Sequence, residues 1–329
     1  MSTRANRLFL TTLTMVSMIA VCVSARQLTG SSGPAVDQAR VSQDDEAYMC
    51  PMHPDVISDT PGTCPRCRMN LVLGKPFDMR DYRLELRSSP ALVKAGEKTT
   101  LELAVSHPGT GEQVKMFTAV HEKRYHLFVM SQDLEFFEHI HPEQKADGAW
   151  AVDVTLPKPG YYQLVSDFVP FGGSAQFLTH PLVTAGYAAD LLADSARLVP
   201  DTVSSKTIGD LTAAVTYDPP RFTPAVHSHM TFHLTRAGSS EPVTDLQTYL
   251  GAFGHVLIVS EDLVHSVHSH PIDMPPQDAD FESLRGGPDV IFEALIPEPC
   301  RYRAWAQFRY HDIVHTFPFT FEVGTLGSR

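Results

Sequence analysis

Several motifs that mark common enzyme classes are missing from this chain of 329 residues. It has no glycine-rich dinucleotide-binding loop, no phosphate-binding P-loop and no Gly-x-Ser-x-Gly nucleophile elbow. No side chains stand out as a general acid and base, or as a nucleophile with its base. We therefore expect a binding protein rather than an enzyme, with metal-assisted catalysis as the less favoured alternative.

Positive charge is scarce as well. Lysine and arginine number 26 against 38 acidic residues, which gives a net charge of −12. The chain also has no basic patch, so we expect no nucleic-acid partner. Hydrophobic residues make up 43% and charged residues 19% of the chain, a balance typical of a folded, soluble body.

Long apolar runs are scarce, and the one at residues 8–23 follows Arg4 and Arg7. The next residues, Ser-Ala, complete a Val-Ser-Ala sequence that suits a signal-peptidase site. Because the run is short for a membrane span, we expect a signal peptide at 1–25, cleaved near Ala25, and an exported or periplasmic protein. An uncleaved segment that anchors the chain in a membrane is the alternative. Cleavage would change the net charge from −12 to −14.

Cysteine is rare too, since only four of the five cysteines follow the expected cleavage site. Cys300 stands alone at a turn, and we interpret it as incidental. The other three fall in CPMHPDVISDTPGTCPRCRM, which begins after a polar tether at 26–46. Thiolates and thioethers are soft ligands that favour Cu(I), and thiolates with imidazole also suit Zn²⁺. We predict a metal-binding domain at 47–74 with six candidate ligands. They are Cys50, Met52, His53, Cys64, Cys67 and Met69.

This segment resembles the short heavy-metal-binding domain of copper-transporting P-type ATPases and of periplasmic adaptors in copper and silver efflux pumps. The matching residues are Tyr48, Cys50-Pro51-Met52-His53-Pro54, Pro61-Gly62 and Cys64-Pro65-x-Cys67-x-Met69. The resemblance implies copper, held as Cu(I). A structural zinc clip, in which Met52 and Met69 only pack, remains the alternative. Arg68 stands where that family usually has glycine, which predicts a strained knuckle or one tuned by the cation.

The rest of the chain contains an internal repeat. HLFVMSQDLEFFEHIHP, from His126, aligns without gaps with HVLIVSEDLVHSVHSHP, from His255. Each copy has short alternating apolar segments separated by turns, and the chain has 25 prolines and 20 glycines. This pattern predicts a mainly β fold: the small knuckle domain, then two tandem antiparallel β-sandwiches of immunoglobulin-like type. We place them at 75–186 and 207–325, with a linker at 187–206.

Both copies carry three histidines at the same spacing. If the Ser-x-Asp-Leu segment makes a hairpin turn, Phe128 lies opposite His139. Three imidazoles then converge on one strand face in each copy, a ligand set that suits Zn²⁺ or Cu(II). The candidates are His126, His139 and His141 in the first copy and His255, His268 and His270 in the second. Histidines on a solvated strand face are the alternative. We expect His121 to face away, because its parity on the strand differs from that of His126.

The whole arrangement is similar to a family of exported bacterial proteins that carry this metal-binding segment ahead of one or two β-sandwich repeats. The second resemblance rests on the histidine hairpins and on the Tyr302-x-x-Trp305-x-Gln307-Phe308 strand. We predict a heavy-metal protein, with copper favoured over zinc, that sequesters or delivers ions. The alternative is an interaction module of a metal-efflux or envelope complex. Its partner would be a protein of that complex, and its cysteine segment would be a structural zinc clip.

Overall fold

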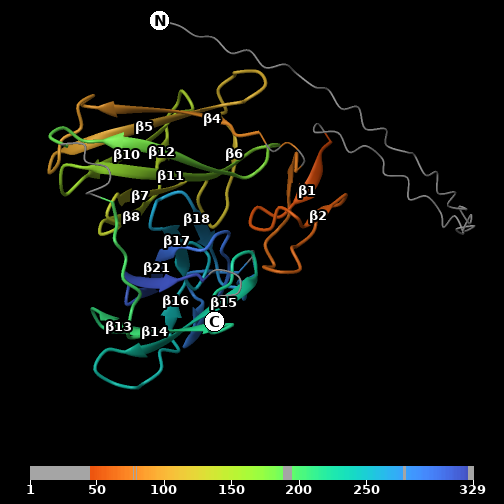
Figure 1. The fold of residues 1–329 in the computed structure, drawn as a ribbon. Helices are drawn as coiled ribbons and strands as arrows, with labels where there is room; N and C mark the ends of the chain where they lie inside the picture. Colours follow the sequence, from red (N-terminus) through yellow and green to blue (C-terminus); the bar gives the residue numbers. More distant parts are fainter. Residues whose placement is uncertain (1–44, 77, 79, 188–194, 277–278, 325–329) are drawn as a thin grey trace, which may run out of the picture. The chain divides into compact units, whose positions relative to one another are not determined.

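The computed structural model describes residues 45–76, 78, 80–187, 195–276 and 279–324 (Figure 1). The expected signal peptide and most of the expected tether lie outside these residues. The described residues form strands and turns, and among them no helix is long and apolar enough to cross a membrane. The prediction of a mainly β chain built from antiparallel sheets is confirmed.

The first sheet is small and holds the cysteine segment. Its strands are β1 (Ala47–Met49), β2 (Ile57–Ser58) and β3 (Val72–Gly74), in the order β2-β1-β3. All pairings are antiparallel. Such a short sheet buries little apolar surface, so a bound metal is the expected source of much of its stability.

The first repeat packs two antiparallel sheets around an apolar core. One sheet has the order β4-β5-β10-β9, and the other has the order β12-β11-β7-β8 with β6 beside β11. Side chains alternate between buried and partly exposed along β5, as expected for a strand with one face on a core. The strands are β4 (Arg83–Ser89), β5 (Lys98–Ser106), β6 (Phe117–Thr118), β7 (His126–Ser131), β8 (Phe137–Ile140), β9 (Glu143–Gln144), β10 (Trp150–Thr155), β11 (Tyr161–Pro170) and β12 (Gln176–Val183).

The second repeat has the same plan. One sheet has the order β13-β14-β15-β20, and the other has the order β18-β17-β21-β16-β19 with β22 beside β21. Its core is rich in phenylalanine and tyrosine, including the fully buried Phe232, Phe292 and Phe308. The strands are β13 (Ser205–Ile208), β14 (Leu211–Asp218), β15 (His227–Arg236), β16 (Leu246–Gln247), β17 (His255–Ser260), β18 (Ser266–Ser269), β19 (Arg285–Gly286), β20 (Asp289–Leu295), β21 (Arg301–Tyr310) and β22 (Ile313–Glu322).

The hairpin turn predicted from Ser-x-Asp-Leu is present in both repeats. Phe128 pairs with His139 and Leu257 pairs with His268, which is the expected register. In the first turn the Ser131 hydroxyl accepts from the Phe136 amide at 3.0 Å. The Ser260 hydroxyl does the same for His265 at 2.9 Å. The motif therefore acts as a turn device, as predicted.

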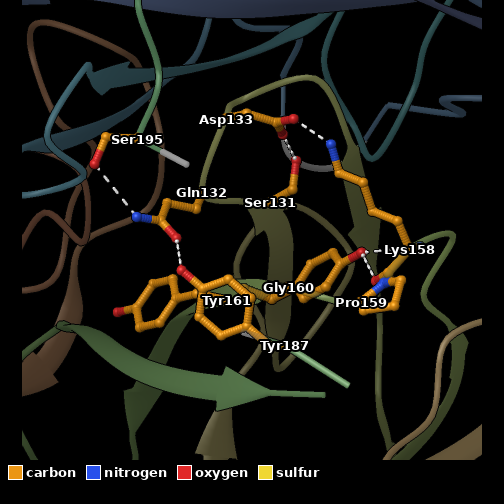
Figure 2. Close-up of a pocket in the computed structure, with 10 residues that line it drawn as sticks. Ser131, Gln132, Asp133, Lys158, Pro159, Gly160, Tyr161, Tyr187 and Ser195 are labelled. Carbon is orange, nitrogen blue, oxygen red and sulfur yellow. Dashed lines mark hydrogen bonds and ion pairs between the residues drawn. The ribbon is translucent and has the colours of Figure 1, made fainter. Parts of the chain in front are cut away.

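A cavity of about 320 Å³ lies beside the first of these turns (Figure 2). Its polar side chains are engaged with one another. Lys158 pairs with Asp133, and the Tyr187 hydroxyl donates to the Gln132 side-chain oxygen at 2.8 Å. We interpret these contacts as stabilising the turn.

Strands β7 and β17 are buried on both faces. One face of each strand contributes to the core of its own repeat. The opposite faces contribute Phe128 and Leu257 to a separate apolar cluster that joins the two repeats, together with Trp305. His126 and His255 have the same strand parity as Phe128 and Leu257, so the imidazoles lie on these shared faces.

Replacing Phe128 by alanine tests this two-sided burial. Phe128 is 1% exposed, and its removal should lower the free energy of unfolding by about 3–5 kcal/mol, measured by urea denaturation. Phe171 is 61% exposed, so Phe171→Ala is the control and should change stability by less than about 0.5 kcal/mol. Similar losses in the two variants would contradict the described packing.

Candidate metal centres

The cysteine segment folds into a tight knuckle. The Arg68 amide donates to the Cys64 carbonyl at 2.8 Å, and the Cys64 amide donates to the Met69 carbonyl at 2.8 Å. Arg68 has a φ of 60°, in the left-handed region that glycine adopts most easily. This explains why a glycine would suit the position, and it agrees with the expected strain.

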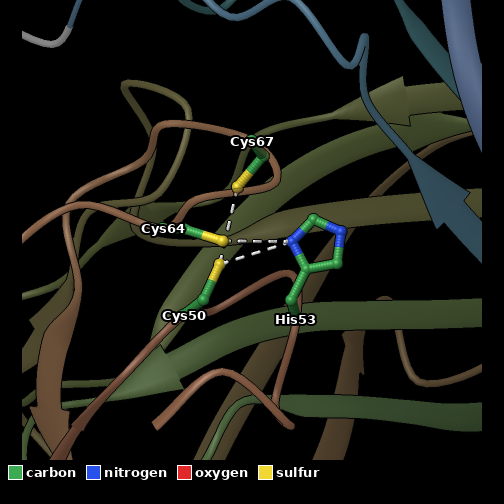
Figure 3. A group of neighbouring side chains, drawn as sticks. All are labelled: Cys50, His53, Cys64 and Cys67. Carbon is green, nitrogen blue, oxygen red and sulfur yellow. Dashed lines mark hydrogen bonds between the residues drawn. The ribbon is translucent and has the colours of Figure 1, made fainter. Parts of the chain in front are cut away.

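Three thiols and one imidazole converge at this knuckle (Figure 3). The Cys50 sulfur lies 3.5 Å from the Cys67 sulfur and 3.6 Å from His53 Nδ1. The Cys64 sulfur lies 3.5 Å from the same nitrogen. Ligands of a tetrahedral Zn²⁺ ion, with Zn–S near 2.3 Å and Zn–N near 2.0–2.1 Å, lie roughly 3.5–3.8 Å apart. The donor atoms therefore fit a four-coordinate metal ion.

Hydrogen bonds within the site ionise one of its thiols. Hydrogen bonds from Cys67 and His53 outweigh burial and lower the pKa of Cys50 to about 4. The hydrogen bond to Cys50, helped by burial, raises the pKa of Cys67. The pKa of His53 is raised, mainly by its hydrogen bond to Cys50. Without metal the site holds a Cys50 thiolate, and the thiolate is the form that binds metal.

The two methionines lie in apolar surroundings. Met69 is buried in one cluster with the three cysteines, and Met52 packs at the edge of that cluster. Ala252 and Met274 of the second repeat belong to the same cluster. His53 Nε2 also lies 3.3 Å from a Glu293 carboxylate oxygen on β20. The knuckle is therefore seated on the second repeat by apolar packing and by this polar contact.

The first-repeat histidines come together as the spacing predicts. Donor atoms of His126, His139 and His141 all lie within 4.8 Å of one another. His126 Nδ1 is 3.1 Å from His139 Nε2, and His126 Nε2 is 3.0 Å from the Val120 carbonyl oxygen. His139 Nδ1 is 2.8 Å from the Gln307 side-chain oxygen, which belongs to the second repeat.

The second-repeat histidines depart from the prediction. His255 and His270 form a group with His121 of the first repeat, and His268 is not part of that group. His121 stacks on His270 with ring centroids 3.5 Å apart. The expectation that His121 faces away is wrong because the residue is not on the strand: it lies in a turn with a φ of 51°, where strand parity does not apply. The aligned position in the second repeat is Leu250. A comparison of the two repeats therefore could not identify His121 as a candidate ligand.

His268 instead donates from Nδ1 to an Asp167 carboxylate oxygen at 2.7 Å. Asp167 belongs to the first repeat and aligns with Gln307 in the second. Each repeat thus orients the central histidine of the other repeat: Asp167 holds His268, and Gln307 holds His139. The two histidine hairpins meet as near-equivalent halves of one interface.

Burial lowers the pKa values of six of the histidines in the two repeats. It lowers the pKa of His126 to about 4 and that of His141 to about 3. Burial also lowers the pKa values of His121, His139, His255 and His270 well below the usual range. Neutral imidazole is the form that binds metal.

Four other histidines pair with carboxylates. They are His227 with Glu293, His233 with Asp289, and both His311 and His315 with Asp210. Cys300 is a free cysteine at a bend, where it packs against the core of the second repeat.

Family comparisons define the class of the chain: a heavy metal binding domain followed by a duplicated β domain. The heavy metal binding domain model matches residues 47–72. A second model, described as a domain of unknown function (DUF8832), matches twice, at 77–185 and 206–325. These two matches cover more than half of the chain, which therefore belongs to the DUF8832 family. Neither description names an enzyme.

The solved structures that match this chain are distant. The FdeC adhesin of Escherichia coli shares 12% identity at a TM-score of 0.22, over 82% of this chain and 76% of that one. The adhesin InvE of Yersinia pseudotuberculosis shares 10% at 0.21, over 73% and 60%. The mouse nectin-like molecule 4 ectodomain shares 10% at 0.19, over 76% and 66%. No curated protein matches the sequence significantly.

Replacing Arg68 by glycine should tighten metal binding. Glycine relieves a left-handed backbone that costs other residues about 1 kcal/mol, and metal binding is coupled to folding of the knuckle. Arg68→Ala is the matched control, because it removes the same side chain but keeps the β-carbon. Competition titrations should give a Zn²⁺ Kd about five-fold lower for the glycine variant than for the alanine variant. Equal Kd values would contradict the strain.

Acid should destabilise the metal-free protein. The unfolded chain takes up protons near pH 6.5, whereas burial holds the pKa of His126 to about 4. Stability is therefore full above pH 6.5 and is lost as the pH falls from there towards 4. With a chelator present, the urea midpoint should stay level from pH 7.5 to about pH 6.5 and then fall steadily to pH 5. A midpoint that stays constant over this range would contradict the burial of neutral imidazoles.

Proposed function

We propose that this protein is an exported heavy-metal-binding protein that sequesters or delivers copper. The observation that carries the proposal is the convergence of Cys50, Cys64, Cys67 and His53 within a heavy metal binding domain. Three thiols make a soft ligand set, which favours Cu(I) over hard cations. The apolar N-terminal run after two arginines supports export through a cleaved signal peptide.

The position of the site supports a role in handling ions rather than in catalysis. His53 and Cys67 line a cavity of about 200 Å³, so the site has access to a small ligand. The sulfur ligands are otherwise surrounded by apolar side chains, which limit competition from water. A site of this kind can accept a soft ion and pass it to a partner with similar ligands.

A structural zinc clip is the second candidate, and the donor spacing favours it. Four ligands at tetrahedral distances satisfy Zn²⁺ completely, with no open position. In that case the knuckle would stabilise an interaction module of an efflux or envelope complex. Pull-down from envelope extracts separates the two: a partner seen only with copper supports delivery, and a metal-independent partner supports scaffolding.

Removing the thiols tests the main proposal. The mature protein should retain about one equivalent of Cu(I) with sulfur ligands, measured by metal analysis and X-ray absorption. A variant with Cys50, Cys64 and Cys67 changed to serine should lose that equivalent, because hydroxyls are poor ligands for soft ions. Cys300→Ser is the matched control and should keep it. Equal, near-zero uptake of copper and zinc by the wild-type and triple-serine proteins would refute the proposal.

A further inference from the structure

Seven histidines meet between the two repeats, outside the heavy metal binding domain. We call them the interface histidine cluster: His121, His126, His139, His141, His255, His268 and His270. Neighbouring rings are close, with centroids 5.7 Å apart for His126 and His268 and 5.8 Å apart for His139 and His255. The cluster therefore draws side chains from both repeats into one group.

The hydrogen bonds of His126 and His255 fix where their protons are. His126 Nε2 faces the Val120 carbonyl oxygen, and His255 Nε2 faces the Tyr249 carbonyl oxygen at 2.9 Å. A carbonyl oxygen only accepts, so each Nε2 carries the proton. A neutral imidazole has one such proton, so Nδ1 of each ring is a bare lone pair. The two rings are held identically by aligned turns in the two repeats.

The central histidines are held in the same way. His139 and His268 direct Nδ1 at side-chain oxygens, of Gln307 and Asp167 respectively, and donate to them. In neutral His139 this leaves Nε2 without a proton. His126 Nδ1 and His139 Nε2 are then two acceptors that face each other at 3.1 Å. Two lone pairs at that distance repel, and a cation bound by both removes the repulsion.

Six of the remaining ring nitrogens are buried and have no hydrogen-bond partner within the described part of the chain. These buried atoms are His121 Nε2, His141 Nε2, His255 Nδ1, His268 Nε2 and both nitrogens of His270. A buried polar atom left unpaired costs about 1–3 kcal/mol, and native structures rarely collect several in one place. A metal ion shared among these rings would bind the one lone pair that each neutral imidazole offers.

We propose that the interface histidine cluster is a second metal centre, which binds a divalent first-row ion such as Zn²⁺ or Cu²⁺ through imidazoles of both repeats. Imidazole nitrogen suits these ions. Ligating histidines usually donate their other N–H to a carbonyl or carboxylate, as His126, His255 and His268 do here. Metal–nitrogen bonds of 2.0–2.1 Å need small ring movements, because the donor atoms of each three-histidine group lie within 4.8 Å of one another.

One cavity lies against both the thiol site and this centre. The cavity that His53 and Cys67 line is also lined by His268 and His270. It therefore touches a soft-ligand site on one side and the interface histidine cluster on the other. The proposal stands on residues other than those of the thiol site and does not depend on copper binding there.

The experiment compares metal content and ligand type in variants of the mature chain, loaded with Zn²⁺ or Cu²⁺ and desalted. The Cys50/Cys64/Cys67→Ser variant should retain at least one equivalent, with only nitrogen and oxygen neighbours by X-ray absorption. Adding His126→Gln and His255→Gln should remove that equivalent, because both lone pairs are lost. His265→Gln is the matched control, since His265 lies in the same hairpin but outside the cluster, and it should change nothing.

A milder variant covers the case in which the glutamine substitutions unfold the chain. Asp167→Asn leaves the ligands in place and loosens only the orientation of His268, so it should weaken Zn²⁺ affinity by about 10–100-fold in the serine background. A folded serine variant without a tightly bound ion would overturn the proposal, as would a Zn²⁺ affinity that neither Asp167→Asn nor the glutamine pair alters. Absence of sulfur-bound metal from the wild-type protein would count against the proposed function of the thiol site and leave this centre standing.

Discussion

Burial of the outer faces of β7 and β17 is the constraint on which the rest of the structure depends. A strand that is covered on both sides must satisfy every side chain on each face. Phe128 and Leu257, the third residue of each strand, do this by apolar packing. The first residue of each strand is a histidine, His126 or His255. Burial disfavours the charged form of its imidazole, and each of the two ring nitrogens then needs a partner. Backbone carbonyl and side-chain oxygens accept a hydrogen bond from one nitrogen of several of these rings. Other ring nitrogens in the cluster have no hydrogen-bond partner within the described residues.

The two candidate centres differ in chemistry because they differ in how they are built. The thiol site is local: a single tight knuckle and the loop after β1 supply all four donors within a short stretch. The interface histidine cluster is non-local, because its seven histidines come from both repeats. Soft ligands therefore lie in a unit with a very short sheet, and nitrogen ligands lie in a frame that apolar packing holds.

Much of this could be predicted from the sequence, and the failures have physical causes. Period-two alternation predicted the strands, and the repeated turn motif predicted the register that placed Phe128 opposite His139. Cysteine spacing indicated the thiol site, and the unexpected Arg68 marked a left-handed residue. His121 was missed because its turn has no strand parity. The exclusion of His268 from its group depends on Asp167 of the other repeat, a contact that no local pattern records.

The near-equivalence of the two halves has a consequence for how such a chain could arise. In a self-complementary contact, the patch that one repeat offers is the patch that it receives. Asp167 and Gln307, at aligned positions, each reach across to the central histidine of the other half. Two separate copies of a single repeat would have the surfaces needed to close the same contact as a symmetric dimer. When both repeats are in one chain, their sequences can diverge. The aligned positions His121 and Leu250 are one such difference.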